Sequence, residues 1–364
     1  MLLVVNAGSS SLKLAVFDGD LAQVAQARRE RIGTGGADSH ATSLRDGLAE
    51  MGIGLGAMRG AAHRVVHGGA ALTAPCRVTP AVIASIEACV PLAPLHNPAN
   101  LIGIRALAAL APDLAQYVSF DTAFHADNPK VATTYALPLA ERSRGLRRYG
   151  FHGLSYAALV RKVQENSESS GIRRLLALHL GNGASICAIV DGVSVATSMG
   201  YSPLEGLTMG TRAGGIDGNA VLKLAEIHGI DGASVILNTQ SGLLGLGGAA
   251  DMRNLHTAGT MEAEFAIEHF CYWAVRHAGS LIAAMGGVDA VAFTGGIGEN
   301  DPVIRQKFVT GLGFVGAEMN PSSNLANAVK LHQTYSKVAI WIVPAEEERQ
   351  IAQEAMGVMA AEAT

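Results

Sequence analysis

The sequence contains the same pattern of residues twice, once at its start and once near its middle. Leu2 to Gly8 leads to an Asp-Gly pair beginning at Asp18, and Leu175 to Gly181 leads to a second pair beginning at Asp191. The copies align without gaps, 173 positions apart, and each predicts a strand, a turn of small residues, a second strand and a tight turn. Many hairpins share such a pattern, so chance is an alternative, but one copy opens each half of the chain. The sequence therefore predicts two related domains.

Length and composition agree with a globular protein of about two domains. The chain has 364 residues, of which 49% are hydrophobic and 16% charged, enough to bury more than one core. A formal net charge of −4 provides no basic field for nucleic acid or an anionic membrane. No stretch approaches the roughly 20 apolar residues of a membrane span, and the apolar start is cut short by Asn6 without a basic flank. We expect no nucleic acid and no membrane as partners.

Cysteine usage is typical of a cytoplasmic protein. The four cysteines are Cys76, Cys89, Cys187 and Cys271. They are widely spaced and form no CxxC pair, so a zinc site or a disulfide framework has little support.

Alternating apolar runs and capping signals predict an α/β fold throughout. Strands are predicted over residues 2–5, 12–17, 64–66, 117–120, 175–180, 186–190, 288–293 and 338–343. Helix starts are predicted at Thr79, Asn97 and Asp301, since each is followed by a proline suited to the first helical position. The strongest helix runs from about Met261 to Met285. Its core candidates include Phe265, Ala266, Phe270, Trp273 and Leu281.

Three glycine-rich or serine-rich turns follow predicted strands. Asn6 to Lys13 combines small residues with a lysine, and His179 to Gly183 and Gly295 to Asn300 are further glycine clusters. Successive backbone N–H groups can approach a phosphate at such turns, above all before a helix N-terminus. Taken singly, each is as well explained by a loop that needs positive φ. The GxxxxGK[ST] pattern is absent, which disfavours a P-loop enzyme. In the third cluster Gly296-Ile-Gly298 is followed by Glu299, Asn300 and Asp301, so it does not complete the GxGxxG pattern, which disfavours hydride chemistry.

Taken together, eight blocks of residues resemble the acetate kinases, part of the acetate and sugar kinase, Hsp70 and actin superfamily, over nearly the full chain. The blocks are Asn6 to Lys13, His63 to Gly69, Ala93 to Pro98, Phe120 to His125, Arg148 to Gly153, His179 to Gly183, Met209 to Arg212 and Gly295 to Asn300. The eight blocks occur in the same order as in the family. A chance match to a single motif would not produce such an order.

The resemblance implies a fold of two actin-like, ribonuclease H-like lobes with a cleft between them. The first lobe would comprise residues 1–148 plus 345–364, and the second, residues 149–344, would carry most nucleotide contacts. A homodimer is also implied. The implied reaction is reversible transfer of the ATP γ-phosphoryl group to acetate, giving acetyl phosphate and ADP, with Mg²⁺, or Mn²⁺ in its place.

For the acid, the resemblance implies that Arg64 binds the carboxylate and that four side chains wall a pocket for the alkyl tail: Val66, Leu95, Phe151 and Pro203. A guanidinium suits a carboxylate, because it can donate two parallel hydrogen bonds. A surface or lobe-bridging salt bridge is the alternative for Arg64 alone. In the family, valine at the position of Val66 accompanies acetate, so acetate is the expected acceptor, although one methylene discriminates by only about 1 to 3 kcal/mol.

For catalysis, the resemblance implies that Arg212 and His152 stabilise the phosphoryl group during transfer and that Asp121 lies at the centre of the site. Donors fixed around the equatorial oxygens supply most of the catalysis of such a transfer. A carboxylic acid with a pKa near about 4 is already ionised at pH 7, so Asp121 is not needed as a base. We expect it to orient Arg212 or to hold water on magnesium; a strand-end cap is the structural alternative.

The nucleotide contacts implied by the family fall on Lys13, His179, Leu180, Gly181, Asn182, Gly183, Asp251, Met252, Arg253, Gly296, Ile297, Gly298, Glu299 and Asn300. Magnesium would lie near Asn6 and Glu347, with Glu346 as the second choice of acid. Few protein oxygen ligands suffice, because phosphates and water complete the shell of this ion.

The sequence departs from the family pattern in three places. Gly215 and Gly218 replace an acid and a proline, which should loosen the turn that supports Arg212. The segment Pro344 to Glu348 also differs, which leaves the register of the metal-side acid open. The region before His63 is short, and Gly33 to Asp38 is predicted to be a loop.

Two other functions compete with acetate phosphorylation. One is a kinase for propionate or another short-chain acid. The other is an actin-like ATPase or binding module whose movement serves a partner protein. Arg64 beside apolar Val66 and Leu95 favours a small acid, and the chain carries no appended binding domain.

Overall fold

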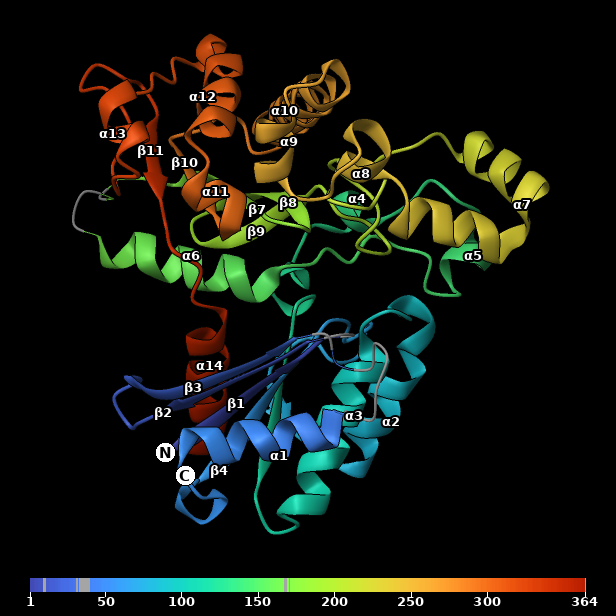
Figure 1. Cartoon of the computed structure of the whole chain (residues 1–364), viewed down its shortest axis with the longest axis vertical. Helices are drawn as coiled ribbons and strands as arrows, with labels where there is room; N and C mark the ends of the chain where they lie inside the picture. Colours follow the sequence, from blue (N-terminus) through green and yellow to red (C-terminus); the bar gives the residue numbers. More distant parts are fainter. Residues whose placement is uncertain (9–10, 31, 33–39, 167–168, 170, 364) are drawn as a thin grey trace. The chain divides into compact units, whose positions relative to one another are not determined.

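The computed structural model describes residues 1–8, 11–30, 32, 40–166, 169 and 171–363, and the chain divides into two compact units (Figure 1). Unit 1 comprises Met1–Ala126, Gly153–Ala158 and Glu346–Thr364; unit 2 comprises Asp127–His152 and Leu159–Ala345. Residues 127–148, predicted in the first lobe, therefore group with unit 2. Glu205 of unit 2 accounts for part of this grouping, since it accepts hydrogen bonds from both Tyr135 and Arg148, each 2.6 Å long.

Unit 1 is built on a six-stranded sheet with the order β3-β2-β1-β4-β6-β5. β1 is antiparallel to β2 and parallel to β4, and β4 is parallel to β6. The strands are β1 Leu2–Ala7, β2 Ser11–Phe17, β3 Gln23–Glu30, β4 Gly60–Val65, β5 Cys76–Arg77 and β6 Gln116–Phe120. The helices are α1 His40–Met51, α2 Pro80–Ala88, α3 Asn97–Leu110, α14 Glu347–Glu362 and the first turns of α6 Gly153–Glu165.

β1 is apolar on both faces because helices cover both sides of the sheet. Leu3 and Val5 belong to a core cluster with residues of α1 and α3, and Leu2 and Val4 belong to one with residues of α14. A strand that is covered on both faces needs a continuous run of apolar residues. A strand with one face exposed to solvent instead alternates apolar and polar residues. The same strand therefore connects both helical layers of unit 1.

Unit 2 is built on a five-stranded sheet with the order β11-β10-β7-β8-β9. The strands are β7 Arg174–Leu180, β8 Ala184–Val190, β9 Val193–Thr197, β10 Ala290–Thr294 and β11 Ala339–Ile342. The helices are α4 Lys130–Thr133, α5 Leu139–Arg142, the rest of α6, α7 Gly218–Thr239, α8 Gly242–Gly247, α9 Met252–Ala258, α10 Met261–Ala284, α11 Gly295–Asn300, α12 Pro302–Gly311 and α13 Pro321–Leu325. α10 packs on β7, β8 and β9. None of the described helices has the combination of length and apolar character needed to cross a membrane.

The two sheets repeat one topology, as the duplicated sequence pattern predicts. The order β3-β2-β1-β4-β6 in unit 1 corresponds strand by strand to β9-β8-β7-β10-β11 in unit 2. In each, a hairpin of two long strands is followed by a parallel strand on the far side of its first strand. The prediction of an α/β fold with duplicated actin-like domains is confirmed.

All eight predicted strands are present, but β3, β5 and β9 were not predicted. β3 has the sequence QVAQARRE and is mostly exposed at the sheet edge, so it lacks the apolar run on which the prediction relied. Thr79 and Asp301 cap α2 and α12 as predicted. The loop predicted over Gly33 to Asp38 lies outside the described residues.

Two further predictions about helices were wrong. Asn97 is the first residue of α3 and not its cap, because its side chain bonds to the backbone of His67. Phe265 was expected in the core of α10, but it is 55% exposed, since it lies on the outer face of that helix.

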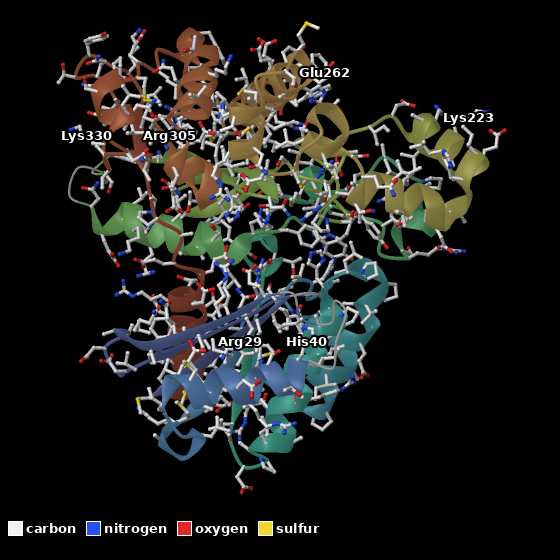
Figure 2. All side chains as sticks on the ribbon, viewed as in Figure 1. Arg29, His40, Lys223, Glu262, Arg305 and Lys330 are labelled. Carbon is white, nitrogen blue, oxygen red and sulfur yellow. The ribbon has the colours of Figure 1, made fainter. Side chains whose placement is uncertain are left out.

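Arg305 of α12 is a fully buried arginine in unit 2. Figure 2 labels it together with Lys223, Glu262 and Lys330, which are exposed. Its guanidinium donates to the carbonyl oxygens of Gly298 and Asn324 and to the side-chain oxygens of Asn324 and Asn327, at 2.6 to 3.0 Å. A buried cation is tolerated when acceptors surround it, so Arg305 joins α11 and α12 to α13.

Replacing Gly218 by proline should stabilise the protein. Gly218 is the first residue of α7, where proline is favoured, no atom lies within 4 Å of a Cβ built there, and Asp217 before it is extended (φ −62°, ψ 134°). Gly218→Pro should therefore raise the free energy of unfolding by about 0.4 to 1 kcal/mol, measured by chemical denaturation. Gly229→Ala is the control of opposite sign, because Gly229 has φ 73°. A lower stability of Gly218→Pro would contradict the helix start.

Candidate functional site

Three parallel strands of unit 1 place polar side chains at one edge of the sheet. Asn6 lies near the end of β1, Arg64 near the end of β4, and Asp121 follows β6 directly. In the parallel pair β4–β6, Arg64 is aligned with Ser119. The carboxyl ends of parallel strands are where ligands bind in open α/β sheets. The sheet therefore brings together residues that are far apart in sequence.

Arg64 and Asp121 form a bidentate, largely buried ion pair. Nη2 of Arg64 lies 2.6 Å from Oδ2 of Asp121, and Nε lies 3.0 Å from Oδ1. The side chain of Asp121 is 2% exposed and that of Arg64 is 21% exposed. The backbone of Asp121 is also fixed, since its N–H donates to Val65 and its carbonyl oxygen accepts from the N–H of Gly153. No local sequence pattern predicts this pairing, since 57 residues separate Arg64 and Asp121.

The charges around Arg64 keep it protonated. Burial alone would lower the pKa of Arg64, but the carboxylates of Asp121, Glu347 and Glu348 raise it overall. Burial raises the pKa of Asp121, and the proximity of Arg64 opposes this effect. Removal of either partner would leave an uncompensated buried charge, which is more costly than the pair itself.

Asp121 uses only one side of the guanidinium. Its carboxylate occupies the Nε and Nη2 edge, and Nη1 points away, 3.7 Å from Oε2 of Glu347. That separation is too long for a hydrogen bond. The Nη1 and Nη2 edge therefore has N–H groups that a second carboxylate could meet.

The segment after β4 is held by two amides of α3. Asn100 accepts a hydrogen bond from the N–H of Val66, and Asn97 accepts one from the N–H of His67, each at 3.1 Å. Val66 is buried, but it lies beyond the end of β4 and not within a strand as expected. Leu95, the other unit 1 residue of the predicted alkyl pocket, is 49% exposed.

The residues predicted for magnesium offer two carboxylates and one amide oxygen. The side-chain amide nitrogen of Asn6 lies 3.3 Å from Glu348, which also lies 3.8 Å from Nζ of Lys13. Glu347 instead faces Arg64. The acidic residue beside Asn6 is therefore Glu348, one position beyond the predicted Glu347. No group of three or more His, Cys, Asp or Glu in the described part of the chain could hold a metal ion. Such a sparse oxygen set fits Mg²⁺ held mainly by phosphates and water.

In unit 2, two predicted catalytic residues converge on one glycine. A Cβ built on Gly183 would lie 3.2 Å from Nε2 of His152 and 3.4 Å from Nη2 of Arg212. Nδ1 of His152 lies 2.8 Å from Oγ of Ser185, and the His152 ring stacks on that of His179 at 4.2 Å. Because Gly183 has no side chain, the side chains of His152 and Arg212 have space between them.

Arg212 is partly buried without a carboxylate partner. Its Nη1 donates to the carbonyl oxygen of Pro203 at 2.8 Å, and none of the described carboxylates forms an ion pair with it. Burial lowers the pKa of Arg212 as a result. An uncompensated guanidinium in a partly desolvated position is suited to bind an anion.

The turn that carries Arg212 is fixed by backbone hydrogen bonds despite the glycines that follow it. The N–H groups of Met209 and Gly210 donate to Arg212 and Asn182, and the N–H of Ser241 donates to Thr211. Gly242 also has to be a glycine, because a Cβ there would lie 2.1 Å from the carbonyl oxygen of Met209. The support expected from the family's acid and proline is thus partly supplied by these bonds.

The residues predicted to contact nucleotide form two groups in unit 2. The turn Gly181 to Gly183 and the third glycine cluster are adjacent, since a Cβ on Gly181 would lie 4.0 Å from the backbone nitrogen of Gly296. That cluster is itself the short helix α11 and not a turn as expected, and Glu299 accepts hydrogen bonds from the N–H groups of Gly295 and Ala345.

The second group is the start of α9. Asp251 caps this helix and pairs with the exposed side chain of Arg253 at 2.6 Å, while Met252 is buried.

Phe151, which was predicted to wall the alkyl pocket, is fully buried in unit 2. Lys13, the remaining predicted nucleotide residue, lies in unit 1 beside Glu348.

Four residues that support the site were not predicted. Ser185 contacts His152, Glu348 contacts Asn6, and Arg305 bonds to the carbonyl oxygen of Gly298. The ring of His40 lies 2.8 Å from the carbonyl oxygen of Gly8, which precedes Ser9 and Ser10 outside the described residues. Of these four residues, only Glu348 could have been noticed in the sequence, because it is the third of three consecutive acidic residues.

The chain is similar to known proteins over nearly its whole length. The model of the Acetokinase family matches residues 49–353. The acetate kinase of Methylocella silvestris is 39% identical over 98% of this chain and 97% of its own. The crystal structure of Porphyromonas gingivalis acetate kinase has a TM-score of 0.90 at 34% identity, covering 98% of this chain and 99% of that one. A propionate kinase from Francisella tularensis has a TM-score of 0.91 at 34% identity, covering 97% and 98%.

His63, the residue before Arg64, makes stability depend on pH. Burial lowers its pKa to about 4, and its Nε2 lies 2.7 Å from the side-chain amide of Gln116. The unfolded chain therefore binds a proton near pH 6.5 that the folded chain binds only near pH 4. Stability should fall as the pH falls through this window, by about 2 kcal/mol between pH 7 and pH 5.

Denaturation curves at the two pH values test this dependence. His63→Gln should remove most of the loss, whereas His228→Gln, at an exposed histidine of unit 2, should leave it unchanged. An equal pH dependence in the wild type and His63→Gln would show that His63 is not the group responsible.

Proposed function

Because the chain belongs to the Acetokinase family and is a phosphotransferase with a carboxyl group as acceptor, we propose that it transfers the γ-phosphoryl group of ATP reversibly to acetate. The products would be acetyl phosphate and ADP. The observation that carries the proposal is the arrangement of Arg64, whose Nε side is occupied by Asp121 and whose Nη1 side can meet a small carboxylate.

On the acid side, Arg64 binds and orients the acceptor. Acetate is already ionised at pH 7, so no residue has to remove a proton. Asp121 positions the guanidinium of Arg64. This role replaces the two that were expected from the sequence, which were to orient Arg212 or to hold water on magnesium. Val66 supports a short alkyl group, because it is buried and fixed by Asn100.

On the phosphoryl side, Arg212 and His152 stabilise the charge of the group in transfer. The equatorial oxygens carry that charge, and donors already in place lower the barrier without reorganisation. Support comes from the convergence of both side chains at Gly183 and from the lack of a carboxylate partner for Arg212 among the described residues.

The nucleotide contacts belong mainly to unit 2. We assign them to residues 179–183, 251–253 and 296–300, with Lys13 from unit 1. Asn6, Glu347 and Glu348 supply the oxygen atoms that would hold Mg²⁺, or Mn²⁺ in its place. A bound divalent ion would neutralise part of the phosphate charge.

Propionate is the second candidate acceptor. One similar structure is described as a propionate kinase, and one methylene changes discrimination by only about 1 to 3 kcal/mol. The actin-like ATPase module loses its support, because the chain is a member of a kinase family over nearly its full length.

We also propose that the protein is a cytoplasmic homodimer. α7 and α10 of unit 2 expose large apolar side chains, including Leu222 (67%), Ile230 (81%) and Tyr272 (63%). Exposed apolar surface of this kind commonly marks a subunit interface. A second copy of the chain is the occupant we assign to these helices.

Hydroxamate trapping of the acyl phosphates formed from ATP with formate, acetate, propionate and butyrate tests the function. Acetate should give the highest kcat/KM, with propionate slower. Val66→Ala should change the propionate-to-acetate ratio in favour of propionate by about tenfold or more, because it enlarges the space beside the alkyl group.

Val24→Ala, at a half-exposed valine of β3, is the matched control and should leave the ratio unchanged. Absence of product from all four acids, together with ATP hydrolysis, would contradict the proposal and favour an ATPase.

A further inference from the structure

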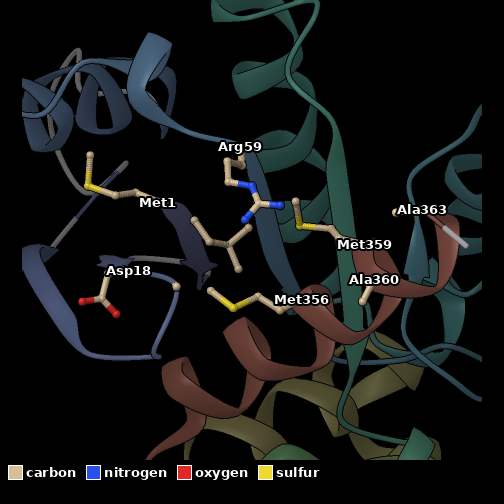
Figure 3. Close-up of a pocket in the computed structure, with 9 residues that line it drawn as sticks. Met1, Asp18, Arg59, Met356, Met359, Ala360 and Ala363 are labelled. Atoms are coloured by element: carbon tan, nitrogen blue, oxygen red, sulfur yellow. The ribbon is translucent and has the colours of Figure 1, made fainter.

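Unit 1 contains a cavity that none of the assigned site residues lines. It has a volume of about 240 Å³ and lies between the start of β1, the turn after β2 and the last turns of α14 (Figure 3). Its lining residues include the apolar side chains of Met1, Leu2, Met356 and Met359. Thioether side chains adapt to ligands of different shape, so the walls suit a flexible apolar group.

Arg59 provides the positive charge of this cavity. Its backbone N–H donates to the carbonyl oxygen of Met1 at 2.8 Å, which fixes where the side chain begins. In Figure 3 its guanidinium extends toward the side chain of Met359. Within the described residues no carboxylate pairs with Arg59, although many other arginines of the chain are paired.

Asp18 does not neutralise this charge. Its Oδ1 accepts hydrogen bonds from the N–H groups of Asp20 and Ala22, each at 2.9 Å, and so closes the turn after β2. Figure 3 shows Asp18 across the cavity from Arg59. A ligand with a single negative group can pair with Arg59, whereas a second negative group would face Asp18.

We propose that this cavity binds an apolar monocarboxylate with a chain several carbons longer than acetate. The carboxylate pairs with Arg59 through charge-assisted hydrogen bonds, and the alkyl chain lies among the methionine side chains. The charge of Arg59 selects a monoanion over a neutral ligand, and the apolar walls select against a phosphate, which needs several donors.

The cavity is separate from the acid site at Arg64. It lies at the amino end of β1, whereas Asn6 and Arg64 lie at the carboxyl ends of their strands. Six residues of strand span about 20 Å. On α14, Met356 follows Glu347 by nine residues, about 13 Å along the helix. A ligand there contacts both β1 and α14, so its binding should stabilise unit 1 against unfolding.

Titration calorimetry of the full chain with octanoate tests the proposal. The wild type should bind octanoate, and octan-1-ol should bind at least about tenfold more weakly, since it lacks the charge. Arg59→Gln should weaken octanoate binding by about tenfold or more, and Arg59→Lys should retain part of it. Ala360→Phe, at a lining residue of the cavity, should abolish binding by filling the space.

A matched variant locates the site. Arg45 lines another apolar cavity of unit 1, and Arg45→Gln should bind octanoate like the wild type. The proposal is overturned if the wild type does not bind octanoate, if Arg59→Gln binds it equally well, or if Arg45→Gln loses binding. These readouts measure binding alone, so they are independent of acyl phosphate formation.

Discussion

The buried pair of Arg64 and Asp121 is the interaction on which the acid side of the site depends. A guanidinium on a strand end has several side-chain conformations, and only a fixed one can bind a small carboxylate in a defined orientation. The two hydrogen bonds from Nε and Nη2 to Asp121 remove that freedom. Asp121 is itself held by Val65 and Gly153. No other residue fits at the position of Gly153, since a Cβ there would lie 2.3 Å from the carbonyl oxygen of Asp121.

The two arginines assigned to the reaction have opposite electrostatic surroundings, which suit different tasks. Arg64 is compensated by three carboxylates, so its affinity for another anion is limited and a bound small carboxylate can also dissociate. Within the described part of the chain, the guanidinium of Arg212 bonds to one carbonyl oxygen, that of Pro203, and burial lowers the pKa of Arg212. It gains most when a highly charged group approaches, as in phosphoryl transfer. The difference arises because acidic residues lie close to Arg64 in unit 1, whereas none of the described carboxylates forms an ion pair with Arg212 in unit 2.

The sequence predicted those parts of the fold and site that depend on local patterns. The repeated hairpin predicted two sheets of one topology, and eight buried strands followed from apolar runs. The edge strand β3 could not be found in this way, because its residues are mostly polar and exposed. Asn97 has the pattern of a helix cap, but a tertiary contact to His67 uses its side chain instead. Similarly, Gly295 to Asn300 was expected as a turn and forms a helix whose first N–H is bonded by Glu299.

Residue roles that depend on partners distant in sequence were beyond prediction. The resemblance indicated Asp121 but not its partner, since 57 residues separate it from Arg64. The sequence left Glu347 and Glu346 as the alternatives for the metal-side acid. The register of α14 against β1 instead places Glu348 beside Asn6 and Glu347 beside Arg64. The cavity at Arg59 has no motif, because its walls come from three separate segments.

A double-mutant cycle on Arg64 and Asp121 tests the central claim most directly. The quantity to measure is kcat/KM for acetate at saturating ATP in the wild type, Arg64→Gln, Asp121→Asn and the double variant. If Asp121 acts through Arg64, the double variant should be little worse than Arg64→Gln, with a coupling energy of about 1.5 to 3 kcal/mol, and the loss in Asp121→Asn should include a higher KM for acetate. Additive losses, with the KM for acetate unchanged in Asp121→Asn, would contradict the account.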